Sequence, residues 1–265
     1  MTVRIDRGGW TLEAEKSGRE DGAPVILLSN SLGTDRGMWA PQRPLLERHY
    51  TVLTYDARGH GGTDTPPPPY TMAGLVADAV AVLDHFGVAR ADYMGLSMGG
   101  MTGLGLALGH PDRVSRLICC DARADAPEGF VKVWADRIAT VGASGMEPLW
   151  APSAERWFTQ RWRDANPEAL EAMRRSFLAI RPEGYAGCAA ALQGLDYLKS
   201  LGTLEMPVLY VCGDVDTGSP PDVMRAMAEA TPGSRFALVE DAAHIANMDN
   251  PDGFNRPVAA FLGIA

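Results

Sequence analysis

The sequence predicts an α/β fold with a mostly parallel central sheet that is flanked by helices and interrupted by an inserted helical segment. Apolar runs of strand length alternate with amphipathic helical patterns over most of the chain. The motif Gly-Leu-Ser-Met-Gly at 95–99 lies between a strand-like run and a helix-like run. Residues 123–195 contain helical patterns and no convincing strand, so the alternation stops there and resumes afterwards.

The predicted elements follow the order that this fold requires. Residues 1–16 are expected to form an opening hairpin, and 66–69 a rigid polyproline-like connector. We divide the chain into a core of residues 1–122 and 196–265 and a helical lid of residues 123–195. The further strands are predicted at 24–29, 50–55, 90–94, 114–120, 206–212 and 234–239, and the helices at 39–48, 71–87, 100–108, 127–142, 153–163, 166–180, 182–194, 220–230 and 251–262.

Ser97 is the predicted nucleophile. A strand, a sharp turn and a helix around it would strain its backbone and lift its hydroxyl above the sheet. Gly95 and Gly99 fit this turn because a side chain at either position would collide with the neighbouring strand or helix. The motif alone also fits chance in a chain with 29 glycines, and the flanking strand and helix favour the catalytic interpretation.

A serine hydroxyl needs a base, and two histidines follow Ser97 in the chain. His110 lies where the helix after the motif should end, which indicates a helix-terminal residue. His244 follows a strand-like run and a short loop, so it is expected just beyond the carboxyl end of a strand. We predict His244 as the base; the alternative is a loop histidine bonded to backbone.

Three carboxylates compete to orient the base. Asp216 lies three residues past Gly213, in a loop with room to turn back over the sheet, and is the preferred candidate. Asp214 directly follows the strand and fits a turn carboxylate that accepts bonds from backbone amides. Asp121, at the end of the strand 114–120, is the more distant alternative.

The developing oxyanion needs two backbone N–H donors. Met98 follows the nucleophile and is the first expected donor. Leu32, in the loop Ser-Asn-Ser-Leu-Gly-Thr at 29–34, is the second; taken alone, that loop also reads as a polar turn. Asn30 of the same loop, with Trp134 and Trp157 of the lid, is predicted to contact the substrate.

With these pieces the chain resembles the α/β-hydrolases, and more narrowly the 3-oxoadipate enol-lactonases of aromatic-acid degradation. The motif Gly-Leu-Ser-Met-Gly at 95–99 and the segment Asp-Ala-Arg-Gly-His-Gly at 56–61 are shared by many α/β-hydrolases. Ser-Asn-Ser-Leu-Gly at 29–33, Trp-Phe-Thr at 157–159 and Glu-Gly-Tyr-Ala at 183–186 point to the lactonase branch. One departure is Asp121-Ala122, where these enzymes tend to carry Asn-Thr.

The resemblance implies hydrolysis of a small ester or lactone through an acyl-enzyme, with no cofactor and no metal. A carboxylesterase, a carbon–carbon bond hydrolase or a perhydrolase could use the same residues, and a non-catalytic small-molecule receptor could share the fold. An enol-lactone that carries a carboxymethyl group needs a cation in the pocket. The candidates in and near the lid are Arg123, Lys132, Arg137, Arg156 and Arg161.

Composition limits the other partners. A net charge of −9 and a pI near 5.0 disfavour nucleic acid and anionic membrane surfaces. The start of the chain lacks an apolar signal region and no apolar run is long enough to span a bilayer, so we expect a cytoplasmic protein. The four cysteines suggest buried apolar residues rather than disulfides or zinc ligands. The sequence leaves the oligomeric state open, a homo-oligomer included.

Overall fold

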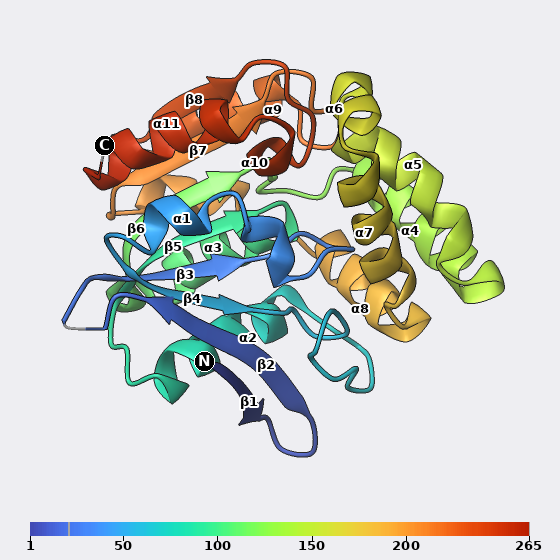
Figure 1. Ribbon diagram of the computed structural model, residues 1–265, viewed down its shortest axis with the longest axis horizontal. Coiled ribbons are helices and arrows are strands. Elements are labelled where there is room, and N and C mark those ends of the chain that lie inside the picture. The colour runs from blue at the N-terminus through green and yellow to red at the C-terminus, as the bar shows by residue number, and fades with distance from the viewer. Residues whose placement is uncertain (21, 265) are drawn as a thin grey trace.

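One eight-stranded sheet runs through the structure, a computed structural model that describes residues 1–20 and 22–264 (Figure 1). The strand order is β1-β2-β4-β3-β5-β6-β7-β8. Both pairings of β2 are antiparallel and the other described pairs are parallel, which confirms the mostly parallel sheet. The strands are β1 (Thr2–Asp6), β2 (Thr11–Gly18), β3 (Val25–Ser29), β4 (Thr51–Tyr55), β5 (Ala91–Leu96), β6 (Val114–Cys120), β7 (Val208–Gly213) and β8 (Arg235–Val239).

Helices cover both faces of this sheet (Figure 1), as the α/β prediction requires. Contact between α2 and α3, and of α3 with β5 and β6, places these two helices on one face. The core helices are η1 (Arg36–Trp39), α1 (Arg43–Leu46), α2 (Met72–His85), α3 (Met98–Gly109), η2 (Pro111–Arg113), η3 (Leu198–Thr203), α9 (Pro221–Ala230), α10 (Ala246–Asp249) and α11 (Pro251–Leu262).

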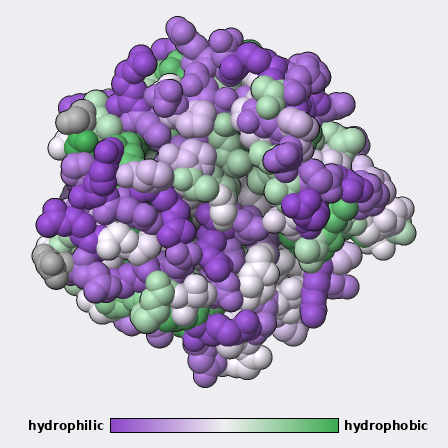
Figure 2. Space-filling model, in the orientation of Figure 1, coloured by the Kyte–Doolittle hydropathy of each residue, from purple (hydrophilic) through white to green (hydrophobic). Residues whose placement is uncertain are grey.

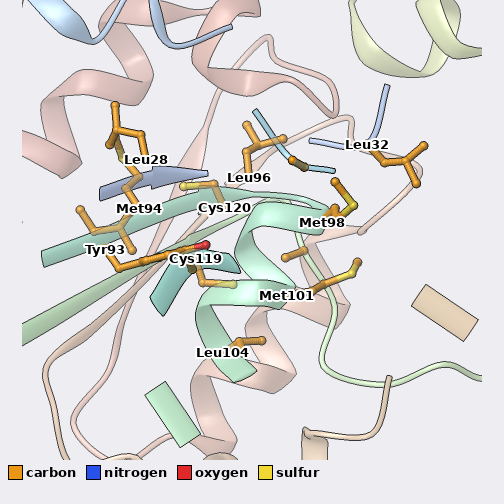
Figure 3. Packing of buried hydrophobic residues seen from close by; sticks show 14 of the residues in the cluster. Leu28, Leu32, Tyr93, Met94, Leu96, Met98, Met101, Leu104, Cys119 and Cys120 are labelled. Atoms are coloured by element: carbon orange, nitrogen blue, oxygen red, sulfur yellow. The ribbon is translucent and has the colours of Figure 1, made fainter. Parts of the chain in front are cut away.

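Most residues of the inner strands are buried, because helices lie on both faces of the sheet. Every residue of β4, β5 and β7 is buried. Figure 3 shows Met98 and Met101 projecting from the first turn of α3, with Tyr93 and Met94 on β5. On the face drawn in Figure 2, hydrophilic residues cover most of the surface and hydrophobic ones form small patches. None of the described helices is both long and apolar enough to cross a membrane.

Between β6 and η3 lie five α-helices, which gather beside one end of the sheet (Figure 1). An isolated bridge between Asp125 and Asp196 joins the two ends of this segment, and α4 packs against α8. The segment therefore leaves the core and returns to it at one place. Its helices are α4 (Glu128–Ser144), α5 (Glu147–Trp157), α6 (Gln160–Ala165), α7 (Pro167–Leu178) and α8 (Pro182–Gln193).

Two predicted helices were wrong. The helix expected at 153–163 is the end of α5 and the start of α6, separated by Phe158 and Thr159. The Thr159 hydroxyl accepts a hydrogen bond from the Trp162 amide and so begins a new helix. In place of the helix expected at 39–48, the structure has only the short α1. Pro44 lies in its first turn, where a proline is tolerated.

We expect the packing of Gly99 to be the least tolerant point of the core. A Cβ atom there would overlap the backbone carbonyl of Ser29, so Gly99→Ala should lower the free energy of unfolding by at least about 2 kcal/mol. Gly109 of the same helix has no atom within 4 Å of an added Cβ. Gly109→Ala should therefore leave stability unchanged or raise it by up to about 1 kcal/mol. Urea unfolding of both variants decides this, and equal losses would contradict the packing argument.

Candidate active site

The predicted site residues meet at the carboxyl ends of the parallel strands. Ser97 follows β5, Asp216 follows β7, and His244 follows β8. The chain crosses from β3 to β4 on one side and later to β5 on the other, so the loops after β3 and β5 flank a topological switch point. Such points are where open α/β sheets hold their ligands.

Ser97 has a left-handed backbone, with φ 56° and ψ −115°. A residue other than glycine adopts this conformation only where the surrounding structure enforces it. A Cβ atom on Gly95 would overlap the Gly99 carbonyl, and one on Gly99 would overlap the Ser29 carbonyl. The steric reason given above for both glycines is thus observed.

Ser97, His244 and Asp216 form a buried row of hydrogen bonds. His244 Nε2 lies 2.9 Å from Ser97 Oγ, and His244 Nδ1 lies 2.9 and 3.0 Å from the two carboxylate oxygens of Asp216. With the proton on Nδ1, the ring donates to Asp216 and accepts from the Ser97 hydroxyl. The exposed fraction of each residue is 5% or less.

Asp216 is arranged to stay ionised despite its burial. Burial opposes its charge, but the His244 ring and the amides of Gly218 and Ser219 outweigh this and lower the pKa of Asp216. The same amides fix the carboxylate geometry, because both donate to Oδ1 at 2.6 and 3.1 Å. The loop thus holds a charged acceptor for the imidazole.

The competing residues lie in other environments. Asp214 accepts a hydrogen bond from the Ala242 amide at 3.1 Å, as a turn carboxylate does. The hydrogen bonds of His244 Nδ1 reach Asp216 and not Asp121. His110 is exposed at the far end of α3, about 18 Å along the helix from Ser97.

The two expected oxyanion donors lie in the loops after β3 and β5. Among the described residues, the amides of Leu32 and Met98 donate no hydrogen bond. Free amides at these places are what an oxyanion would require. His60 fixes the first loop, because its Nε2 accepts from the Gly33 amide at 3.0 Å and its Nδ1 donates to the Arg58 carbonyl at 3.1 Å.

Asn30 does not lie where we expected it. It is fully buried; its amide nitrogen donates to the carbonyls of Ser31 and Thr34, and its oxygen accepts from the Ala57 amide. With its polar atoms engaged by backbone, Asn30 braces the loop and does not line the cavity over Ser97. The prediction of a substrate contact at Asn30 is therefore wrong.

A cavity of about 380 Å³ opens over Ser97 and His244, between the core and α4. Trp134, Phe130 and Val133 give it an apolar wall. Trp157, the other predicted pocket tryptophan, is absent from this wall. It packs with Trp150 and Phe177 (centroids 6.1 and 5.6 Å away) and lies against Gly33.

Arg156, at the end of α5, lines the same cavity and differs from the other candidate cations. Its guanidinium forms no hydrogen bond or ion pair with the described residues, its Nε is buried, and its Cζ lies 5.6 Å from the centre of the Trp134 ring. Burial and the nearby Arg137 lower the pKa of Arg156 to about 10, which leaves it charged at neutral pH. Its backbone carbonyl accepts from the His244 amide at 3.4 Å.

The remaining candidate cations have partners. Arg123 lines the cavity but pairs with Asp125 at 3.1 Å. Lys132 pairs with Asp136 on the surface, and Arg161 donates to the Asp241 carbonyl. Arg137 donates to the hydroxyls of Tyr185 and Ser153.

The sulfur of Cys212 and carboxylate oxygens of Asp121 and Asp216 lie within 4.8 Å of one another. The Cys212 thiol donates to the carbonyls of Gly213 and Ser219, and burial raises its pKa well above the usual range. A protonated thiol is a poor metal ligand, so we interpret these three residues as the buried surroundings of the Asp216 carboxylate and not as a metal site.

Comparison with known proteins supports the fold. The family model for the alpha/beta hydrolase fold matches residues 24–251. The 3-oxoadipate enol-lactonase 2 of Acinetobacter baylyi is 34% identical, over 90% of this chain and 88% of that protein. The crystal structure of the enol-lactonase from Burkholderia xenovorans is 36% identical with a TM-score of 0.93, over 99% of this chain and 100% of that one. A thermophilic esterase from Thermogutta terrifontis, solved with malate bound, is 30% identical with a TM-score of 0.90, over 99% of this chain and 98% of that one.

The chain therefore belongs to the alpha/beta hydrolase fold family. Within this family we assign it as a hydrolase of carboxylic esters or lactones, and its resemblance to the enol-lactonases is confirmed.

His60 had no role in the sequence-based prediction, and it gives a test of the loop that carries Leu32. Burial lowers its pKa to about 4, against about 6.5 for an exposed histidine. Between these values the unfolded chain binds a proton that the folded protein does not. The free energy of unfolding should thus fall by about 3 kcal/mol from this group as pH drops from about 6.5 to 4.

Urea unfolding over this pH range measures the loss, and His60→Gln should remove this part of the slope. The exposed His110 provides the matched control, because His110→Gln should keep the wild-type slope. Equal slopes in wild type and His60→Gln would contradict a neutral, buried His60.

Proposed function

We propose that this protein is a serine hydrolase that opens 3-oxoadipate enol-lactone to 3-oxoadipate. The observation that carries the proposal is Arg156, which has no partner among the described residues and lies partly buried in the cavity over the hydrogen-bonded row of Ser97, His244 and Asp216. The row supports ester or lactone cleavage, and the arginine supports a substrate that carries a carboxylate. The enol-lactonase relatives favour this lactone among such substrates.

In the first step, Ser97 Oγ attacks the lactone carbonyl while His244 Nε2 takes its proton. Asp216 holds the ring through Nδ1 and stabilises the imidazolium that forms. The amides of Leu32 and Met98 donate to the oxyanion, and each such donor typically contributes about 3 kcal/mol. The carbon–oxygen bond of the ring then breaks, and the oxygen leaves as an enolate that His244 protonates.

In the second step, His244 accepts a proton from water, and the resulting hydroxide attacks the acyl-enzyme carbonyl. The second tetrahedral intermediate collapses, Ser97 regains its proton from His244, and the acid is released. The enol formed in the first step becomes the ketone of 3-oxoadipate. Because an enolate is a stabilised leaving group, ring opening requires only modest acid assistance.

Residues 123–195 act in this proposal as a lid that selects the substrate. A partly buried guanidinium without a protein partner is free to form charge-assisted hydrogen bonds with a carboxylate. Arg156 and the ring of Trp134 form one wall, suited to a short chain that ends in a carboxylate. The esterase relative solved with malate bound is consistent with a pocket that accepts carboxylates.

Substitution of two neighbouring carboxylates tests the assignment of Ser97, His244 and Asp216 as a catalytic triad. Asp216→Asn should lower kcat by roughly three to four orders of magnitude, because the amide no longer fixes the His244 tautomer. Asp214→Asn should cost less than about tenfold, since Asp214 bonds only a turn amide. Both are assayed on p-nitrophenyl acetate beside Ser97→Ala, which sets the level of complete loss. If the two severities were reversed, the acid would be Asp214.

Charge recognition distinguishes the lactone from a plain ester. Arg156→Met should lower kcat/KM on 3-oxoadipate enol-lactone by about thirtyfold or more, roughly 2 kcal/mol, and leave a neutral ester of similar size almost unchanged. The ultraviolet change on ring opening follows the reaction. Arg161→Met, on the surface, and Arg123→Met, paired within the cavity wall, are the controls. Equal losses of Arg156→Met on both substrates would favour a neutral-ester hydrolase.

A further inference from the structure

Asp121 is a fully buried carboxyl group for which the proposed mechanism has no use. It follows the carboxyl end of β6, next to the strand that leads to Asp216. Its Oδ1 accepts a hydrogen bond from the Gly213 amide at 2.8 Å. Its Oδ2 is buried and has no partner among the described residues, although the Asp216 carboxylate lies within 4.8 Å.

Two carboxylates this close in a buried site cannot both be ionised without a large cost. Asp216 receives hydrogen bonds from His244, Gly218 and Ser219 and is compensated as an anion. From the described part of the chain, Asp121 receives a single hydrogen bond, the one from Gly213. The pair should therefore hold one proton, and that proton belongs on Asp121.

We propose that Asp121 is a neutral carboxylic acid that donates a hydrogen bond from Oδ2 to the Asp216 carboxylate, and so acts as a positioning residue for the acid of the triad. The donated hydrogen bond satisfies the unpartnered oxygen and fixes the Asp216 plane against His244. It also withdraws part of the Asp216 charge from the imidazole. The proposal rests on the triad of the proposed function but not on the identity of the substrate.

The titration of the two groups agrees with this placement of the proton. Burial raises the pKa of Asp121 well above its ordinary value, and the negative charge of Asp216 adds to the effect. The pKa of Asp216 is lowered. The other titratable groups that face Asp121 or its partner are the thiols of Cys119, Cys120 and Cys212, the carboxylate of Asp249, the imidazole of His244 and the guanidinium of Arg156.

The backbone at this position accepts two informative substitutions without added strain. Asp121 has φ 45°, a left-handed conformation that asparagine and glycine tolerate. Asp121→Asn keeps the shape and a donor but has no acidic proton. Asp121→Gly fits the backbone and removes the donor. Asp214→Asn, which removes a carboxylate of the β7–α9 loop whose hydrogen-bond partner is the Ala242 amide, is the matched control.

The first measurement is the infrared spectrum of the unliganded protein at neutral pH. We expect the carbonyl band of a buried protonated carboxylic acid in wild type and in Asp214→Asn, and its loss in Asp121→Asn. If wild type and Asp121→Asn do not differ in this band, Asp121 is ionised and the proposal fails. This measurement needs no substrate, so it decides the place of the proton even if the lactonase proposal fails.

The second measurement is the pH profile of kcat/KM on p-nitrophenyl acetate, whose acid limb reports protonation of the base. In Asp121→Asn the midpoint of the acid limb should stay within about 0.3 pH unit of wild type, because a donor remains and no charge changes. Asp121→Gly should move it upward by roughly half to one unit, since a fuller Asp216 charge favours the imidazolium. If the midpoint moved down by about one pH unit in Asp121→Asn, Asp121 would be ionised in wild type. If it did not move in Asp121→Gly, the positioning role would be excluded.

Discussion

The close approach of helix α3 to strands β3 and β5 is the constraint on which the site depends. Gly99 lies so near the Ser29 carbonyl that no side chain fits, and Gly95 lies equally near Gly99. This approach forces the chain to reverse within a few residues and holds Ser97 in a left-handed conformation. The same contact brings the loop of Leu32 beside the first turn of α3, so one packing event places the proposed nucleophile and both proposed donors. The strain at Ser97 persists because buried apolar contacts around α3 outweigh it.

The protein has a net charge of −9, but the site contains both a negative and a positive side chain. Asp216 is stabilised by amides and by His244, whereas nearby Asp121 receives one amide hydrogen bond from the described residues, too little to compensate a second negative charge. In the cavity over Ser97, Arg156 supplies a positive charge that no described residue pairs with. A carboxylated substrate would thus meet the cation on the lid side, while the anion that serves the base stays below His244. Arg156 lines the cavity, whereas Asp216 lies outside its lining.

The sequence was sufficient for features that depend on local geometry. The turn at 95–99 follows from the steric demands of Gly95 and Gly99, and the succession of strands and helices along the core follows from the alternation of apolar runs. The structure brings His244 to Asp216 because both lie in loops at the same sheet edge, which strand ends predict. Asn30 and His60 could not be interpreted in this way, because their hydrogen bonds reach across the loops to Ala57 and Gly33. Likewise, five cations were equivalent in sequence, and only their tertiary partners distinguish Arg156 from Arg123.

Chemistry and selection are physically joined at the end of α5. The carbonyls of Arg156 and Trp157 accept hydrogen bonds from the amides of His244 and Ile245 at 3.4 and 3.0 Å. Asp249 adds a second link, since its carboxylate accepts from the Thr159 amide and from the Ala243 amide. The inserted helices therefore hold the backbone of the proposed base as well as the proposed carboxylate receptor. Any displacement of α5 would move the guanidinium and the imidazole together, so a lid that is not seated over its substrate would also misplace the base. The proposed selection by residues 123–195 and the proposed proton transfer by His244 are for this reason coupled through the backbone, although the residues come from different parts of the chain.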